Sequence, residues 1–180
     1  TLVVEKVLKS TGLTHDFAPL VYMLGHGASS VNNTYYAGYD CGACCGRPGS
    51  VNARIFANIA NKPAVRSELK RRGIFIPKST QFIGGLHDTT RDEVAFFDEE
   101  FLTPENITRH FENKSTFNKA LTLNAKERSR RFVAINTKAS AAKIHEQVKK
   151  RAITIFEPRP ELNHASNCLC VIGRREMSKD

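Results

Sequence analysis

Tryptophan is absent from the sequence, methionine occurs only twice, and there is no long apolar run. A transmembrane helix needs about 20 consecutive apolar residues, whereas the longest apolar stretch, residues 17–24, is interrupted by Pro19. We therefore predict no membrane span and interpret this stretch as a buried strand. Residues 1–10 lack the basic start, the apolar stretch and the cleavage site of a secretory signal. The initiating methionine is also missing, so we expect the chain to be a piece of a longer protein.

Cysteine is present, but its pattern argues against disulfide bonds. The five cysteines are odd in number, and two of them, Cys44 and Cys45, are adjacent. Such a set is a poor disulfide framework. We therefore expect a reducing compartment, in which the thiols bind metal or remain buried.

The composition is that of a soluble globular protein with an excess of positive charge. Hydrophobic residues make up 41% and charged residues 25% of the 180 positions, and the formal net charge is +9. This length is sufficient for one domain with a core. The basic residues concentrate in residues 62–73 and 126–151, with the spacing of helices that have solvated faces. Because aromatic residues are not interleaved with these charges, we expect no nucleic-acid partner.

The periodicity of the apolar residues predicts alternating helices and strands. Helices are expected at residues 1–9, 51–61 and 63–72 and, with breaks, from 103 to 151; strands are expected at residues 17–24, 80–86, 94–97 and 168–172. Ser50 and Thr103 are the expected N-caps. The alternation is typical of an α/β fold with a mostly parallel sheet and helices on its faces.

We expect residues 1–180 to form a single domain with three consecutive parts. Residues 1–61 contain a strand, a glycine-rich loop and a helix, residues 62–102 a helix and strands, and residues 103–180 a helical region and a final strand. In open α/β sheets, ligands bind at the carboxyl ends of the strands. The glycine-rich loop begins at such an end, so we expect the functional site there.

This loop carries side chains that bind metals. His26 directly follows the predicted strand between Gly25 and Gly27, and Cys41 and Cys44 form a Cys-x-x-Cys pair further along. Three interpretations remain open. The pair could belong to a closed structural zinc site, it could be a thioredoxin-like redox pair, or His26 and one thiolate could be ligands of a catalytic zinc that keeps a position open for water.

Several further residues are candidates for supporting roles. Asn32 and Asn33 could hold the loop by hydrogen bonds or surround a metal site, and Asp40 could be a ligand, a general base or a turn residue. His87 ends a predicted strand beside several carboxylates and is a pocket candidate. The thiols of Cys168 and Cys170 are expected to be small core residues. The remaining histidines are expected at the surface: His15, His110, His145 and His164.

Four segments together resemble the DabA family, also called MpsB. They are GHGASSVNN (25–33), YDCGACCGRPGSVNAR (39–54), GLHDTTRDEV (85–94) and RPEL (159–162). The family comprises large soluble subunits of bacterial inorganic-carbon uptake systems, and its members are far longer than this chain. The sequence departs from the family in lacking tryptophan near the RPEL segment and in having Cys45 where a glycine is expected.

The resemblance implies a core similar to β-carbonic anhydrases, with a zinc ion held by four residues. Two of these belong to a Cys-x-Asp motif in an earlier part of the protein, and no such motif occurs here. The other two match His26 and Cys41. The chain is thus expected to carry half of a metal site, and a catalytic Asp-Arg dyad is expected outside it. Enzymatic activity, the hydration of CO2 to bicarbonate, is expected only in the full-length complex.

The same resemblance implies a membrane partner, DabB, which is similar to the ion-translocating subunits of respiratory complex I. The subunit would then be peripheral, at the cytoplasmic face of the bacterial inner membrane. Two alternatives remain beside this hypothesis. One is a non-enzymatic structural-zinc or nucleic-acid-binding module, and the other is a thiol redox protein that uses Cys41 and Cys44.

Overall fold

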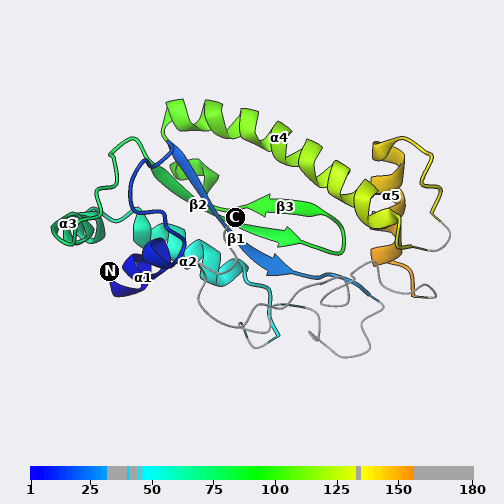
Figure 1. Cartoon of the computed structure of the whole chain (residues 1–180), viewed down its shortest axis with the longest axis horizontal. Helices are drawn as coiled ribbons and strands as arrows, with labels where there is room; N and C mark the ends of the chain where they lie inside the picture. Colours follow the sequence, from blue (N-terminus) through cyan, green and yellow to red (C-terminus); the bar gives the residue numbers. More distant parts are fainter. Residues whose placement is uncertain (32–39, 41–43, 45, 133–134, 156–180) are drawn as a thin grey trace.

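The computed structural model describes residues 1–31, 40, 44, 46–132 and 135–155. Within these residues, a three-stranded sheet has the order β1-β2-β3 (Figure 1). β1 (Leu20–Gly27) runs parallel to β2 (Gln81–Asp88), and β3 (Glu93–Phe96) runs antiparallel to β2. The predicted α/β class is confirmed, but the described sheet is mixed, with one parallel and one antiparallel pair, and not mostly parallel as predicted. Residues 89–92 form a tight turn, and a connection this short can join only antiparallel strands.

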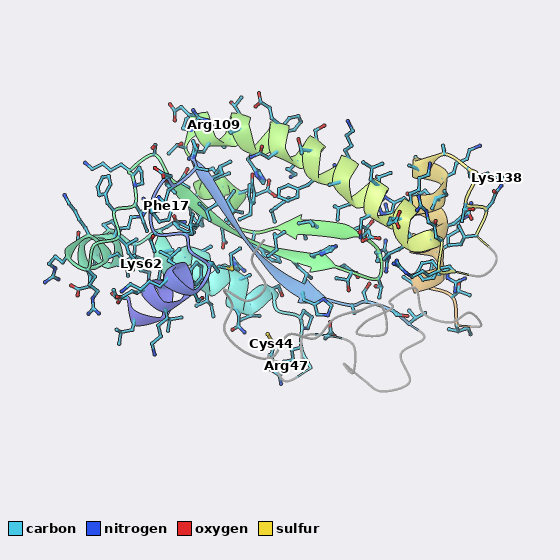
Figure 2. The ribbon with its side chains drawn as sticks, in the orientation of Figure 1. Phe17, Cys44, Arg47, Lys62, Arg109 and Lys138 are labelled. Carbon is cyan, nitrogen blue, oxygen red and sulfur yellow. The ribbon has the colours of Figure 1, made fainter. Side chains whose placement is uncertain are left out.

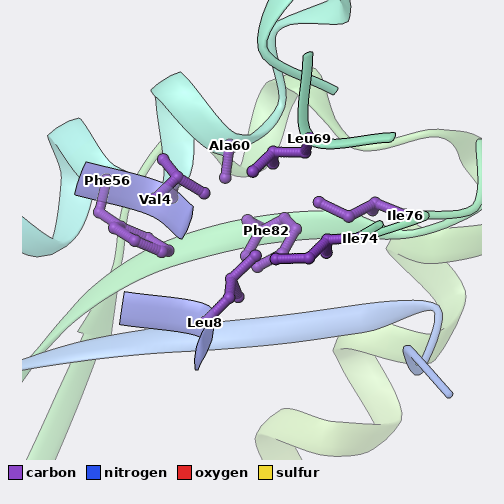
Figure 3. Close-up of a cluster of buried hydrophobic side chains, with 9 residues drawn as sticks. Val4, Leu8, Phe56, Ala60, Leu69, Ile74, Ile76 and Phe82 are labelled. Carbon is purple, nitrogen blue, oxygen red and sulfur yellow. The ribbon is translucent and has the colours of Figure 1, made fainter. Parts of the chain in front are cut away.

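Three helices cover one face of the sheet: α1 (Leu2–Ser10), α2 (Ser50–Ala60) and α3 (Pro63–Arg71). Figure 3 shows the core that they form with β2, where the aliphatic side chains surround the ring of Phe82. The buried members of this core are Val4, Leu8, Phe56, Ala57, Ala60, Leu69, Ile74, Ile76 and Phe82. Burial of large apolar side chains contributes about 1.5–3 kcal/mol each, so this cluster is the main support of β2 and of the strand end that it carries.

Helix α2 lies unusually close to the sheet because glycines face it. A Cβ atom on Gly84 would lie 2.6 Å from the Cα atom of Arg54, and one on Gly25 would lie 2.3 Å from the carbonyl carbon of Gly49. Distances this short are not tolerated between non-bonded carbon atoms, so only glycine fits at either strand position. The first turn of α2 is thereby held directly against the carboxyl-terminal half of β1.

The opposite face of the sheet is covered by α4 (Pro104–Ser129), which follows the short 3₁₀ helix η2 (Glu99–Phe101) and runs alongside the sheet in Figure 1. Leu20, Ile83 and Leu102 form the buried cluster on this side. α5 (Ala141–Ala152) packs on the carboxyl-terminal half of α4 through Ala125 and Ile144. Thr103 is the N-cap of α4, as predicted, and its hydroxyl accepts a hydrogen bond from the Asn106 amide.

Two expectations at the start of the chain need correction. β1 begins and ends three residues later than the predicted strand, so His26 is paired within the strand and does not follow it. Ser50 is the first residue of α2, and the cap position belongs to Gly49, so the predicted Ser50 cap is wrong. The predicted strand 168–172 lies outside the described residues. In the part of the chain that the structure describes, no helix has both the length and the apolar character needed to cross a membrane.

Candidate functional site

The site predicted from the sequence lies where β1 and β2 end side by side. The two strands are parallel, with His26 opposite His87 and Gly27 opposite Asp88. Side chains alternate between the faces of a strand, so His26 lies on the same face as Tyr22, and His87 on the same face as Ile83. That face is the one covered by α4, because Tyr22 and Ile83 belong to the cluster on that side. The two imidazoles are therefore neighbours at one edge of the sheet.

Asp88 ties the segment after β1 to the turn after β2. Its Oδ1 atom accepts hydrogen bonds from the Thr90 amide at 3.1 Å and from the Thr90 hydroxyl at 2.7 Å, and the Ser29 hydroxyl donates to Oδ2. The Ser29 amide in turn donates to the buried Thr90 hydroxyl oxygen at 3.1 Å. Asp88 and the turn after β2 thus form a hydrogen-bonded brace that fixes both strand ends.

His26 is positioned through its backbone and its ring. The Gly49 amide donates to the His26 carbonyl at 2.7 Å, which anchors the strand end to α2. The Thr89 hydroxyl donates to the Gly27 carbonyl at 3.1 Å, and its oxygen lies 3.5 Å from Nδ1 of His26. Because the single hydroxyl proton is used on Gly27, the oxygen can only accept from Nδ1–H. This arrangement favours the tautomer in which Nε2 carries the lone pair that a metal requires.

Asp40 and Cys44 lie against the same strand end. The Asp40 Oδ1 atom accepts a hydrogen bond of 2.9 Å from the Ala28 amide, which makes this carboxylate a brace of the loop. The Cys44 sulfur accepts a hydrogen bond of 3.2 Å from the Asn52 side chain in the first turn of α2. Figure 2 places Cys44 beside Arg47, off the amino-terminal end of α2. Cys44 and His26 line one groove together.

The structure therefore brings four of the predicted site residues to one edge of the sheet: His26, Asp40, Cys44 and His87. The other three, Asn32, Asn33 and Cys41, lie outside the described residues. Among the residues that the structure describes, no group of three or more histidine, cysteine, aspartate and glutamate side chains is arranged to hold a metal ion. The described residues alone therefore do not make up a complete metal site.

A buried ionic network behind His87 was not predicted. Asp92, 1% exposed, accepts hydrogen bonds from Asn124 at 2.7 Å and from Nε of Arg128 at 3.0 Å, and Nη2 of Arg128 lies 2.8 Å from the same carboxylate. The buried Nε2 atom of His87 lies 3.7 Å from Asp92 Oδ1. Burial alone would raise the pKa of Asp92, but His87, Arg128 and Asn124 together hold this pKa below its ordinary value.

This network joins α4 to the β2–β3 turn and so to the rear of the site. In the sequence, Asp92 is one of several acidic residues in a polar loop, and Arg128 is one of many basic residues on a helix. Their separation of 36 residues carries no periodic signal. The contact depends on how α4 runs alongside the sheet, which the sequence pattern does not encode.

Two histidines predicted at the surface are buried. His110 lies on the inward side of α4, where Nδ1 is 2.9 Å from the Tyr22 hydroxyl and Nε2 is 3.0 Å from Glu99. Burial lowers the pKa of His110, and the neighbouring Glu99 opposes this shift only partly. His145 is buried on α5, with Nε2 at 2.9 Å from the Arg91 carbonyl. The prediction of a surface position is wrong for both histidines, because each side chain lies on the side of its helix that packs against the rest of the protein.

The two other histidines have different outcomes. The side chain of His15 is 79% exposed, as predicted. His164 lies outside the described residues. Of the three described histidines that were expected at the surface, the two on α4 and α5 are buried, since the polar spacing of these helices concealed which side faces inward.

Over residues 1–180 the chain matches the protein family described as "Probable inorganic carbon transporter subunit DabA". A relative of this name from Nitrosospira multiformis is 61% identical over 98% of this chain and 20% of its own length. One from Azotobacter vinelandii is 59% identical over 97% of this chain and 21% of its own length. The chain thus spans about a fifth of the length of these curated relatives.

No solved structure matches the chain, so the expected likeness of its core to β-carbonic anhydrases stays a prediction. The family match extends over every segment from which the resemblance was inferred, including the described strand ends that hold His26 and His87. The chain therefore belongs to the DabA family.

Proposed function

We propose that the chain is one part of an inorganic-carbon transporter subunit and that it supplies two ligands, His26 and Cys41, to a zinc ion at which CO2 is hydrated. The names of its relatives support a role in inorganic-carbon transport. The observation that carries the zinc proposal is the placement of His26, whose ring is held at the carboxyl end of β1 with Nδ1 facing the Thr89 hydroxyl. Histidines that bind a metal through one ring nitrogen characteristically donate a hydrogen bond from the other ring N–H to an oxygen atom in this way.

Cys41 lies outside the described residues, and its assignment follows from the family resemblance. The described residues on either side of it in the sequence support the assignment. Asp40 is bonded to the Ala28 amide, two residues after His26, and Cys44 lines a groove with His26. Imidazole and thiolate are both preferred zinc ligands. The two remaining ligands would come from the part of the protein outside this chain, so the chain alone is expected to be inactive.

When bound, zinc supplies a Lewis acid that makes water a nucleophile at neutral pH. The residues of this chain would position the His26 ligand and the strand ends around it. Thr89 would favour the tautomer of His26 that carries its proton on Nδ1, and Asp88 ties the turn that carries Thr89 to the segment after β1. His87, whose Nε2 atom lies near the Asp92 carboxylate, would line the site beside the zinc ligand His26. CO2 would be attacked at this edge of the sheet and leave as bicarbonate.

The partner and the location belong to the same proposal. The subunit would associate with a DabB-like membrane protein at the cytoplasmic face of the bacterial inner membrane. Coupling of hydration to cation movement through that partner would make uptake effectively one-way. The net charge of +9 is compatible with docking on an anionic surface.

Metal analysis of the full-length subunit tests the zinc proposal. We expect about one zinc per purified subunit, falling to below about a tenth in His26→Ala and Cys41→Ala, because loss of a ligand weakens binding and lets the ion exchange during purification. His15→Ala is the matched control, since that side chain is largely solvated. Full zinc content in His26→Ala, or none in the unaltered subunit, would refute the assignment.

A further inference from the structure

An apolar groove of about 450 Å³ lies between α1, β1 and α2. Three large apolar side chains along it are exposed: Val3 on α1, Leu24 on β1 and Ile55 on α2, with exposed fractions of 67%, 37% and 51%. Leu2 and Val51 extend the exposed apolar surface on the two helices. A hollow with contiguous exposed apolar side chains marks an interaction surface, whereas single exposed apolar residues do not.

The chemistry of the groove restricts what can fill it. Among the described residues, no lysine, arginine, aspartate or glutamate lines it, although the chain has a net charge of +9. An acidic partner or an anionic lipid surface would be recognised by basic side chains, and those lie elsewhere. The groove instead suits an apolar polypeptide segment, because its binding would be favoured by the burial of Ile55 and Leu24 away from water.

The backbone beside the groove is also suited to a polypeptide. In the part of the chain that the structure describes, β1 is an edge strand and pairs only with β2. An exposed strand edge offers a row of amide and carbonyl groups to a further chain segment. The chain spans about a fifth of the length of its relatives, so a large amount of polypeptide is available outside it to cover this side.

We propose that this groove is an internal interface, filled by an apolar segment of the longer polypeptide that lies outside residues 1–180. The segment packs against Val3 and Ile55 and reaches the edge of β1. Since His26 lines the same groove, the segment also lies next to the strand end that carries the candidate site. This interface does not depend on zinc or on carbon chemistry, so it can hold or fail independently of the proposed function.

Site-specific photocrosslinking in the full-length polypeptide tests the interface. Ile55 is replaced by p-benzoyl-phenylalanine, and Phe75 is the matched control because it is 59% exposed and lies outside the groove, beneath the Lys70 ammonium. Val3 supplies a second groove position should the Ile55 variant fold poorly. We expect the groove positions to crosslink at least about fivefold more than Phe75, since a water-excluding interface keeps the probe against one partner.

Mass spectrometry of the crosslinked peptides identifies the occupant. The proposal requires a peptide of the same polypeptide from outside residues 1–180, and samples mixed from isotopically light and heavy subunits show that both peptides come from one molecule. Mixed-isotope crosslinks would identify a second copy and overturn the proposal. Crosslinks to another protein or to lipid, or a yield no higher than that of Phe75, would overturn it as well.

Discussion

The buried Asp92 carboxylate provides the sharpest test of the structure, because the chain contains a matched control. Asp92 and Asp98 both have a positive φ, of 52° and 60°, and each accepts hydrogen bonds from an arginine side chain. They differ in burial: the side chain of Asp92 is 1% exposed and that of Asp98 is 21% exposed. Replacement by asparagine keeps the shape and tolerates a positive φ, so Asp92→Asn and Asp98→Asn compare the same chemical change in two environments.

The expected cost at Asp92 follows from its partners. Both carboxylate oxygens accept hydrogen bonds, one from Asn124 and the other from Arg128. An amide offers only one acceptor, so the Asp92→Asn side chain directs its own N–H groups at one of these donors. Removing one member of a buried ion pair costs about 3–5 kcal/mol, whereas an exposed pair is worth about 0–1 kcal/mol. For a protein of this size these values correspond to losses of about 6–20 °C and under about 4 °C in the unfolding midpoint.

Urea unfolding at pH 7, followed by circular dichroism, measures both free energies of unfolding. The partners lower the pKa of Asp92, so the stability that it contributes is present above the ordinary aspartate pKa and is lost as the pH falls through the lowered value. The difference between the unaltered protein and Asp92→Asn should therefore shrink below about pH 4. Equal costs at Asp92 and Asp98, or a difference that grows on acidification, would refute this account of the network.

Three further predictions concern other parts of the molecule. Burial lowers the pKa of His110, so the protein should lose stability as the pH falls from 7.5 to 5, and His110→Phe should flatten that loss; an unchanged slope would contradict this. Gly84→Ala should lower the free energy of unfolding in urea by about 3 kcal/mol, because its Cβ atom would overlap the backbone of α2. Gly73→Ala is the control and should lower it by about 1 kcal/mol, because its φ is +86° but its surroundings are open. Similar losses for the two variants would mean that α2 adjusts freely. Thr89→Val should weaken zinc binding by the full-length subunit about tenfold through loss of the hydroxyl beside His26, measured by competition with a chelator, and unchanged affinity would separate Thr89 from the site.

Local signals in the sequence located most elements but not their packing. The predicted helix at residues 63–72 and the predicted Thr103 cap placed α3 and the start of α4 nearly as observed. These signals work because each depends on a few adjacent residues. The sheet was predicted less well, since the direction of β3 is set by the length of the turn before it. His26 was expected after β1 because glycines usually end a strand, yet here the close approach of α2 requires them within it.

For the candidate site, too, the sequence identified residues but not the contacts between them. The sequence singled out His26 and His87, and the parallel register places them opposite each other. The pattern did not reveal that Thr89 faces the His26 ring, or that Asp92 and Arg128 support His87. These contacts join residues from different elements, and their geometry depends on how α4 runs alongside the sheet. Hydrophobic periodicity reports which face of an element is buried, but not which polar groups meet beneath it.

The alignment of β1 with β2 has a consequence for how this protein can misassemble. Alternating side chains mean that sliding β1 by one residue would send the imidazole of His26 to the α2 side and place a glycine hydrogen opposite His87. The same slide would drive a side chain into the helix that only Gly25 now allows so near. Mispaired molecules would thus contain a steric clash and would lack the His26 imidazole at this end of the sheet. The same three residues, Gly25, His26 and His87, therefore determine both the strand register and the chemistry of the site.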